Sequence, residues 1–84
     1  MQLLYTARFL RSLKKLSVNT KEEVIATIVL FEDAPKHPLL KLRKLSGKWK
    51  GYHAISVGFR YRIILKVTKK ETHCMDIGTH DVYE

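Results

Sequence analysis

Apolar residues near the start of the chain have the spacing of a short strand followed by a helix. Residues 2–5 form a brief apolar run that predicts a strand, and Thr6 follows as a candidate N-cap. The positions that share one face of the predicted helix are Phe9, Leu10, Leu13 and Leu16. The opposite face carries arginine and lysine, so this helix is predicted to be amphipathic.

A second amphipathic helix is predicted from about residue 20. Thr20 and Glu23 have the spacing of a capping box, which marks a helix start. The apolar positions of this helix are Val24, Ile25, Ile28, Val29 and Phe31. Residues 33–38 contain two prolines, which end the helix because proline fixes φ and biases its predecessor toward extended backbone. The two helices are therefore predicted to form a hairpin.

From Leu39 onward the chain reads as strands separated by turns. The predicted strands span residues 41–45, 52–57, 61–67 and 72–77. The side chains assigned to one buried face are Ile55, Val57, Ile63, Leu65, Val67 and Cys74. The run from Ile63 to Leu65 is continuous, so alternation alone does not decide which way each of its side chains faces.

These elements predict an α+β fold, with residues 1–84 as a single domain. The predicted order is β-α-α-β-β-β-β, with a two-helix hairpin packed on a twisted, mainly antiparallel sheet of four to five strands. A chain of 84 residues has a modest core, because it buries only about two-thirds of its unfolded surface. The helices cover one sheet face, and the other face is left for function.

The charge of the chain favours a polyanionic partner. Lys and Arg number 16 against 8 Asp and Glu, which gives a formal net charge of +8. The residues expected to contact nucleic acid surround one predicted turn: Lys41, Arg43, Lys44, Lys48, Trp49 and Lys50. Basic residues interleaved with an aromatic suit an RNA backbone with stacked bases. Trp49 is also consistent with a core anchor, and the charge with a merely solvated basic surface.

The sequence gives little support to a redox-active cysteine, a metal site or a membrane-spanning segment. Cys74 is the single cysteine, and its place in a strand pattern predicts a buried thiol in a reducing compartment. The four histidines match no tetrahedral spacing, so neither a metal site nor a cofactor is expected. The N-terminal apolar run is too short for a signal peptide, and no stretch approaches the roughly 20 apolar residues of a membrane span. We therefore expect a cytoplasmic protein with no membrane partner.

Candidate phosphate and acid–base residues lie near the C-terminus. Arg60 and Arg62 occupy alternate positions of a predicted strand, where they would share one face and hold phosphate oxygens. A solvated outer face is the alternative, since such faces are ordinary in antiparallel sheets. His80 lies past the last strand and can exchange a proton near neutral pH, or simply cap a surface end. Tyr83 can stack on a base or close the core.

RNA cleavage is the reaction that these residue types suit. RNA carries its own nucleophile in the 2′-hydroxyl, so a site needs in-line positioning, cations and proton carriers. In our hypothesis Arg62, with Arg60, stabilises the pentacoordinate phosphorus. His80 donates a proton to the 5′-oxygen or helps to remove the 2′ proton, and Tyr83 orients the scissile nucleotide.

Three segments of the chain together resemble RelE/ParE toxins, nearest the YafQ-like branch. They are residues 42–52 (LRKLSGKWKGY), 61–65 (YRIIL) and 76–83 (DIGTHDVY). The resemblance covers nearly the whole chain and implies a RelE-like fold. It also implies a bacterial type II toxin–antitoxin module, in which the toxin cleaves mRNA in the ribosomal A site and a cognate antitoxin protein neutralises it.

The resemblance also implies roles for four residues. By position, Arg62 resembles the family's phosphate-binding arginine, His80 the catalytic histidine of the YafQ-like branch, and Tyr83 the C-terminal aromatic. His53 falls near positions where relatives carry a lysine or another polar catalytic residue.

Three departures from the YafQ-like pattern keep other functions open. Arg43 stands where many relatives have histidine, Arg60 stands where they have an acidic residue, and the segment between Asp81 and Tyr83 is one residue shorter. One alternative is a ParE-like inhibitor of DNA gyrase without nuclease activity. The other is a non-catalytic RNA- or ribosome-binding module, for which basic charge would suffice.

Overall fold

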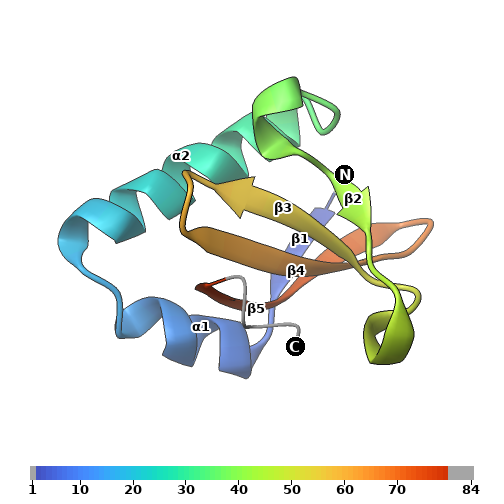
Figure 1. The fold of residues 1–84 in the computed structure, drawn as a ribbon, viewed down its shortest axis with the longest axis horizontal. Helices are drawn as coiled ribbons and strands as arrows, with labels where there is room; N and C mark the ends of the chain where they lie inside the picture. Colours follow the sequence, from blue (N-terminus) through green and yellow to red (C-terminus); the bar gives the residue numbers. More distant parts are fainter. Residues whose placement is uncertain (1, 80–84) are drawn as a thin grey trace.

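Two helices and five strands follow one another in the predicted order (Figure 1). The computed structural model describes residues 2–79. The helices are α1 (Ala7–Lys14) and α2 (Val18–Asp33). The strands are β1 (Gln2–Tyr5), β2 (Arg43–Lys44), β3 (His53–Val57), β4 (Tyr61–Val67) and β5 (Glu71–Thr79). Single turns of 3-10 helix, Pro38–Leu40 and Gly47–Trp49, flank β2. Within residues 2–79 no helix has the length and apolar character needed to span a membrane.

The strands form one mixed sheet in the order β1-β5-β4-β3-β2. Three of the four pairings are antiparallel, and β1 pairs in parallel with β5. The α+β class, the element order and the mainly antiparallel sheet are therefore confirmed. A parallel pair needs a long connection, and here both helices and three strands lie between its members in the sequence.

Both helices begin at a capping side chain, and one of these caps differs from the prediction. The Thr6 hydroxyl accepts a hydrogen bond from the Phe9 amide at 3.0 Å and starts α1, as predicted. Ser17 accepts from the Thr20 amide at 3.2 Å, so α2 begins at Val18. The predicted start at Thr20 is wrong, because this residue already lies in the first helical turn.

The segment between α2 and β3 contains less strand than predicted. Of residues 41–45, only the two residues of β2 pair with β3. Lys41 adopts a left-handed backbone with a φ of 48° and ends the Pro38–Leu40 turn, so it cannot continue a strand. Residues 47–49 form a 3-10 turn where the sequence indicates a simple turn.

One face of the sheet forms the core with the helices. The buried apolar cluster consists of Phe9, Val24, Phe31, Leu40, Ile55, Val57, Ile63, Leu65, Cys74 and Ile77. Ile64 is fully buried but lies outside this cluster, because it alternates with Ile63 and Leu65 along β4. The prediction for Val67 is wrong: this last residue of β4 is 47% exposed beside the turn to β5.

Some apolar positions of the predicted helical faces remain exposed. Leu10 of α1 and Ile25 and Val29 of α2 are each more than half exposed, at 51%, 59% and 59%. They line a groove between the two helices rather than the core. Helical periodicity marks these residues as apolar, but it does not show how wide a stripe the sheet covers.

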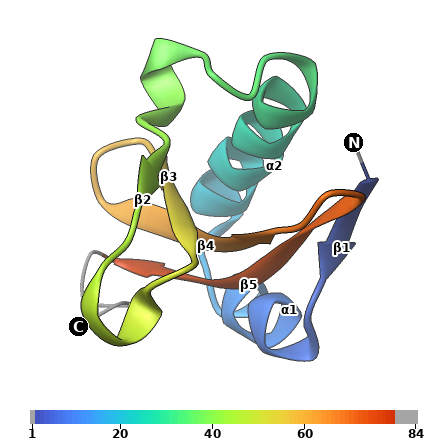
Figure 2. The same cartoon turned by 90° about the vertical axis from the view of Figure 1, so that its right-hand side faces the viewer.

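The start of α1 is joined to β5. The Thr6 amide donates to the Cys74 carbonyl at 3.2 Å, and the Thr6 hydroxyl donates to the Met75 carbonyl at 2.8 Å. β1 pairs only with residues 71–74 of β5, and α1 packs beside the remainder. Figure 2 shows α1 below β5 and α2 above β4.

A bulge in β5 changes which side chains face the core. The register with β4 shifts between Ile64 and Leu65, so Cys74 and Ile77 both enter the core cluster. In a regular strand, residues three apart point to opposite faces. The irregularity therefore allows β5 to supply core residues on both sides of the bulge.

Asp76 connects this strand to α1. The carboxylate is 7% exposed and accepts hydrogen bonds from Arg8 Nε at 3.0 Å, Ser12 Oγ at 2.7 Å and the Ile77 amide at 2.8 Å. A buried carboxylate is stable only when such donors replace water. The network therefore fixes the position of α1 along β5.

Replacing Asp76 with alanine is expected to lower the free energy of unfolding by about 2–3 kcal/mol, because the Ser12 hydroxyl and the buried Ile77 amide lose their acceptor. Arg8→Ala is the matched control. The Arg8 side chain is 70% exposed, so its loss should cost less than about 1 kcal/mol. Urea unfolding followed by circular dichroism measures both, and equal losses would contradict the importance assigned to the buried network.

The Cys74 thiol is expected to be unreactive in the folded protein. Burial, with a smaller contribution from Glu32, raises the pKa of Cys74 to about 12, so little thiolate forms at mildly alkaline pH. Labelling with a thiol reagent should be slow without denaturant and fast in urea, where the pKa returns to about 8.5. Fast labelling of the native protein would be incompatible with this placement of Cys74.

Candidate nucleic-acid interface

Two arginines with Ser56 between them lie on the sheet face that turns away from the core. Arg62 on β4 pairs with Ser56 on β3, and Arg43 on β2 pairs with Ala54, two residues from Ser56. Paired residues share a face, and side chains alternate along each strand, so these three point opposite to the core cluster. We call Arg43, Ser56 and Arg62 the arginine cluster.

The Arg62 guanidinium is held against the β3–β4 turn. Its Nη1 donates to the Tyr61 carbonyl at 2.8 Å and to the Phe59 carbonyl at 3.2 Å. Its Nε is buried and has no hydrogen-bond partner among the described residues. Leaving a buried donor unpaired is costly, so such groups normally bind an acceptor. A guanidinium group is of the type that binds phosphate oxygens.

Arg43 is positioned by the chain just before β2. Its Nη1 donates to the Lys41 carbonyl at 2.7 Å and to Ser56 Oγ at 3.4 Å. Ser56 is only 5% exposed, and its hydroxyl binds one of the two guanidinium groups of the arginine cluster. The positive charge of the arginine cluster is therefore preorganised rather than carried on mobile side chains.

The end of β5 lies beside the arginine cluster. Gly78 pairs with Arg62, and Thr79 pairs with Tyr61. The two predicted C-terminal site residues, His80 and Tyr83, lie outside the described residues. The strand that leads to them ends next to the predicted phosphate-binding arginine.

Arg60 and His53 are not brought into the arginine cluster. Arg60 lies in the exposed turn before β4, so it does not share the regular alternation of that strand with Arg62. His53 alternates with Ile55 on β3 and therefore faces the core side of the sheet. Its Nδ1 is buried without a partner within residues 2–79. Over the same residues, no three His, Cys, Asp or Glu side chains gather as a metal ion would require.

The predicted basic turn separates into exposed lysines and a packed aromatic. The exposed residues are Lys41, Lys44, Lys48 and Lys50. Trp49 is half-buried and meets Tyr52 edge-on, with ring centroids 5.3 Å apart and planes at 88°. Its Nε1 is buried and unpaired in the described part of the chain. Trp49 thus packs within its loop, while the lysines provide the charged surface.

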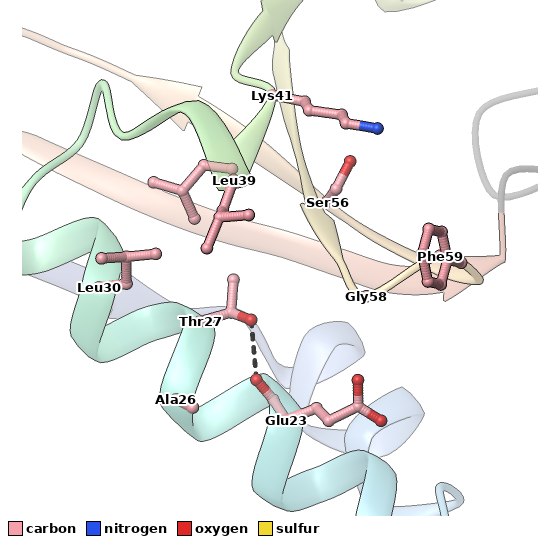
Figure 3. Close-up of a pocket in the computed structure, with 10 residues that line it drawn as sticks. Glu23, Ala26, Thr27, Leu30, Leu39, Lys41, Ser56, Gly58 and Phe59 are labelled. Atoms are coloured by element: carbon pink, nitrogen blue, oxygen red, sulfur yellow. Dashed lines mark hydrogen bonds between the residues drawn. The ribbon is translucent and has the colours of Figure 1, made fainter.

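A groove that the sequence analysis missed lies between α2 and the β3–β4 turn (Figure 3). Its volume is about 480 Å³. Its lining includes Glu23, Ala26, Leu30, Lys41, Ser56 and Phe59. A large apolar residue between glycine and arginine in a predicted turn, Gly58-Phe59-Arg60, is the signal that could have pointed to it.

Comparison with known proteins bears on the fold. No protein-family model and no curated protein matches the sequence. Solved structures do match. YafQ from E. coli strain BL21(DE3) is 22% identical with a TM-score of 0.82, covering 99% of this chain and 98% of that chain. A YoeB/ParE toxin from Agrobacterium tumefaciens is 18% identical with a TM-score of 0.78, covering 95% and 99%.

A further match comes from an assembly. A chain of the E. coli DinJ–YafQ toxin–antitoxin complex is 22% identical with a TM-score of 0.71, covering 99% of this chain and 97% of that chain. All three matches extend over nearly the full length of both proteins, so they concern the whole arrangement of helices and strands. The chain therefore has the RelE-like toxin fold seen in YafQ and in the YoeB/ParE toxin.

Proposed function

We propose that this protein is the toxin of a type II toxin–antitoxin system and acts as a ribosome-dependent mRNA endoribonuclease. The observation that carries this proposal is the arginine cluster, which holds Arg43 and Arg62 on either side of Ser56 beside the end of β5. The fold supports it, because proteins with the same fold are described as toxins. The net charge of +8 favours approach to RNA.

The proposed reaction is attack of an RNA 2′-hydroxyl on the adjacent phosphate. The 2′-oxygen forms a bond to phosphorus, and the bond to the 5′-oxygen breaks, leaving a 2′,3′-cyclic phosphate and a 5′-hydroxyl end. A base takes the 2′ proton, and an acid gives a proton to the leaving oxygen. Arg62 and Arg43 stabilise the extra negative charge of the pentacoordinate phosphorus.

His80 and Tyr83 complete this mechanism. We assign proton transfer to His80, because imidazole titrates near neutral pH and His80 directly follows Thr79, which pairs beside Arg62. Tyr83 is assigned to orienting the scissile nucleotide. Arg60 contributes positive charge from the exposed turn and no defined contact.

The proposed protein partner is a small acidic antitoxin that docks between the helices. The groove between α1 and α2 has a volume of about 250 Å³ and an almost wholly apolar lining. Leu10, Ile25 and Val29 are exposed along it, which suits the apolar face of an amphipathic helix. The arginines and lysines of α1 favour an acidic partner. The DinJ–YafQ complex shows that a protein of this fold occurs in a toxin–antitoxin assembly.

Arg62→Ala is expected to lower the rate of mRNA cleavage by about 10²–10³-fold, the usual effect of removing one preorganised donor from a developing charge. Primer extension on mRNA from expressing cells, together with growth rate, measures the effect. Arg60→Ala is the matched control. It removes the same charge from the exposed turn and should lower cleavage by less than about tenfold.

Primer extension on His80→Ala, together with a measurement of RNA binding, separates proton transfer from binding. The cleavage ends should disappear while RNA binding remains. Cleavage and growth arrest that survive both Arg62→Ala and His80→Ala would refute the nuclease assignment. Growth arrest with gyrase inhibition and no cleavage ends would favour the ParE-like alternative. RNA binding with no cleavage by the wild type would favour the non-catalytic one.

Ile25→Glu is expected to weaken binding of the antitoxin by about 30-fold or more, because it places a carboxylate in an apolar contact and opposes an acidic partner. The partner to test is the product of a small adjacent reading frame, and calorimetry measures its affinity. Val18→Glu is the matched control, since Val18 is an exposed residue of the same helix outside the groove. Equal effects of the two variants would place the antitoxin elsewhere.

A further inference from the structure

Phe59 is an aromatic side chain presented to water by a fixed turn. It is 96% exposed, so it contributes almost nothing to the core. The turn itself is held, because the Phe59 carbonyl accepts a hydrogen bond from Arg62 Nη1 at 3.2 Å. Gly58 supplies the positive φ of 60° that lets the chain reverse there. The aromatic ring is therefore held in water by the turn and is accessible to a ligand that stacks on it.

The groove found beside this turn begins at Phe59. Figure 3 shows Phe59 at one end and Leu30 of α2 at the other, with Leu39 opposite α2. Ala26, Leu30 and Leu39 make much of its wall apolar. A volume of about 480 Å³ lies in the range of sites that take a small planar ligand.

Positively and negatively charged side chains lie on opposite sides of this groove. Lys41 and Ser56 lie on the side of the arginine cluster. Glu23 lies on the α2 side and reaches the turn, since a Cβ built on Gly58 would stand 2.7 Å from Glu23 Oε2. A carboxylate repels phosphate, whereas cations attract it. The backbone of a bound nucleic acid therefore belongs at the arginine cluster, and an uncharged group belongs beside Glu23.

We propose that Phe59 stacks on an unpaired nucleobase of the RNA substrate, and that the groove between α2 and the β3–β4 turn receives this base. The inference rests on the proposed nuclease function and adds the residue that holds the base. Every base has a π-face, so stacking by itself accepts any of them. Glu23 adds a preference for guanine, because the N1–H and N2–H donors of guanine can both bind one carboxylate.

The surroundings of Phe59 favour RNA over a protein. Phe59 is a single apolar side chain next to Arg60 and bonded through its carbonyl to Arg62. An aromatic beside cations matches a nucleotide, which has a flat base and a charged phosphate. The groove between α1 and α2 instead presents a continuous apolar lining, as a protein helix requires.

Stacking can be measured directly with single-stranded RNA that carries 2-aminopurine at each position in turn. Uniform 2′-O-methyl substitution prevents cleavage, so the readout is binding alone. The full-length wild type should change the fluorescence at one position. Phe59→Ala should abolish that change and weaken binding by roughly 5- to 100-fold. Phe59→Trp should retain both properties, whereas Phe59→Leu, which lacks a π-face, should behave like Phe59→Ala.

Two further variants sharpen the experiment. Val18→Ala removes another exposed apolar side chain, 69% exposed and outside this groove, and should change neither readout. Glu23→Gln should preserve stacking and reduce the preference for guanine-containing RNA by roughly 5- to 100-fold, the discrimination carried by one bidentate contact.

The outcomes distinguish this inference from the proposed function. If Phe59→Ala binds and stacks as the wild type does while mRNA is still cleaved, the inference is wrong and the nuclease proposal stands. If Phe59→Ala loses antitoxin binding but keeps RNA binding, the side chain serves a protein partner, and the inference is again wrong. Stacking lost in Phe59→Ala supports it even in a protein that leaves no cleavage ends. A wild type that shows no fluorescence change with any of these RNAs overturns the inference, whereas cleavage of mRNA in expressing cells still decides the nuclease proposal.

Discussion

The parallel pairing of β1 with β5 is the contact on which the remaining arrangement depends. It places the first residues of the chain against residues 71–74, and Thr6 closes the pairing with hydrogen bonds to the carbonyls of Cys74 and Met75. From that point α1 runs beside the rest of β5, where Asp76 binds it. The end of β5 is thereby fixed beside β4, and the last described residues come to lie next to Arg62.

The central strands contribute to the core on one face and carry the arginine cluster on the other. Ile63 and Leu65 enter the core from β4, while Arg62 points the opposite way from the same strand. Packing on the first face therefore fixes the backbone that positions the arginine cluster. Ala54 and Ile64 are fully buried outside the core cluster, so part of the second face is apolar too. Apolar neighbours limit hydration and strengthen the attraction between fixed cations and an anion.

Helix α2 forms a wall of two different grooves. Ile25 and Val29 face α1, and the surface they line is apolar. Glu23 and Ala26 face the β3–β4 turn, where the groove is mixed in polarity and borders the arginine cluster. The two surfaces can therefore recognise different partners. Solved proteins of this fold share only about a fifth of their residues with this chain, so its recognition chemistry has to be argued from its own side chains.

The sequence by itself determined the order and type of the elements, because these depend on residues close together in the chain. The Thr6 cap, the prolines after α2 and the alternation along β3 and β4 are local signals of this kind. It also predicted Arg62 as a phosphate ligand through its residue type and position. The exact start of α2 was predicted incorrectly, since Ser17 rather than Thr20 caps this helix.

Only the tertiary structure decided which distant residues meet. The β1–β5 pairing joins residues about seventy positions apart, and the bulge that brings Ile77 to the core arises from the register between two strands. Arg43 reaches Ser56 because β2 pairs with β3, and Arg60 leaves the strand because the turn includes it. Non-local pairing and packing set these positions, and no periodicity within one segment records them. The groove at Phe59 has the same origin, since its walls come from a helix and a turn about thirty residues apart in the sequence.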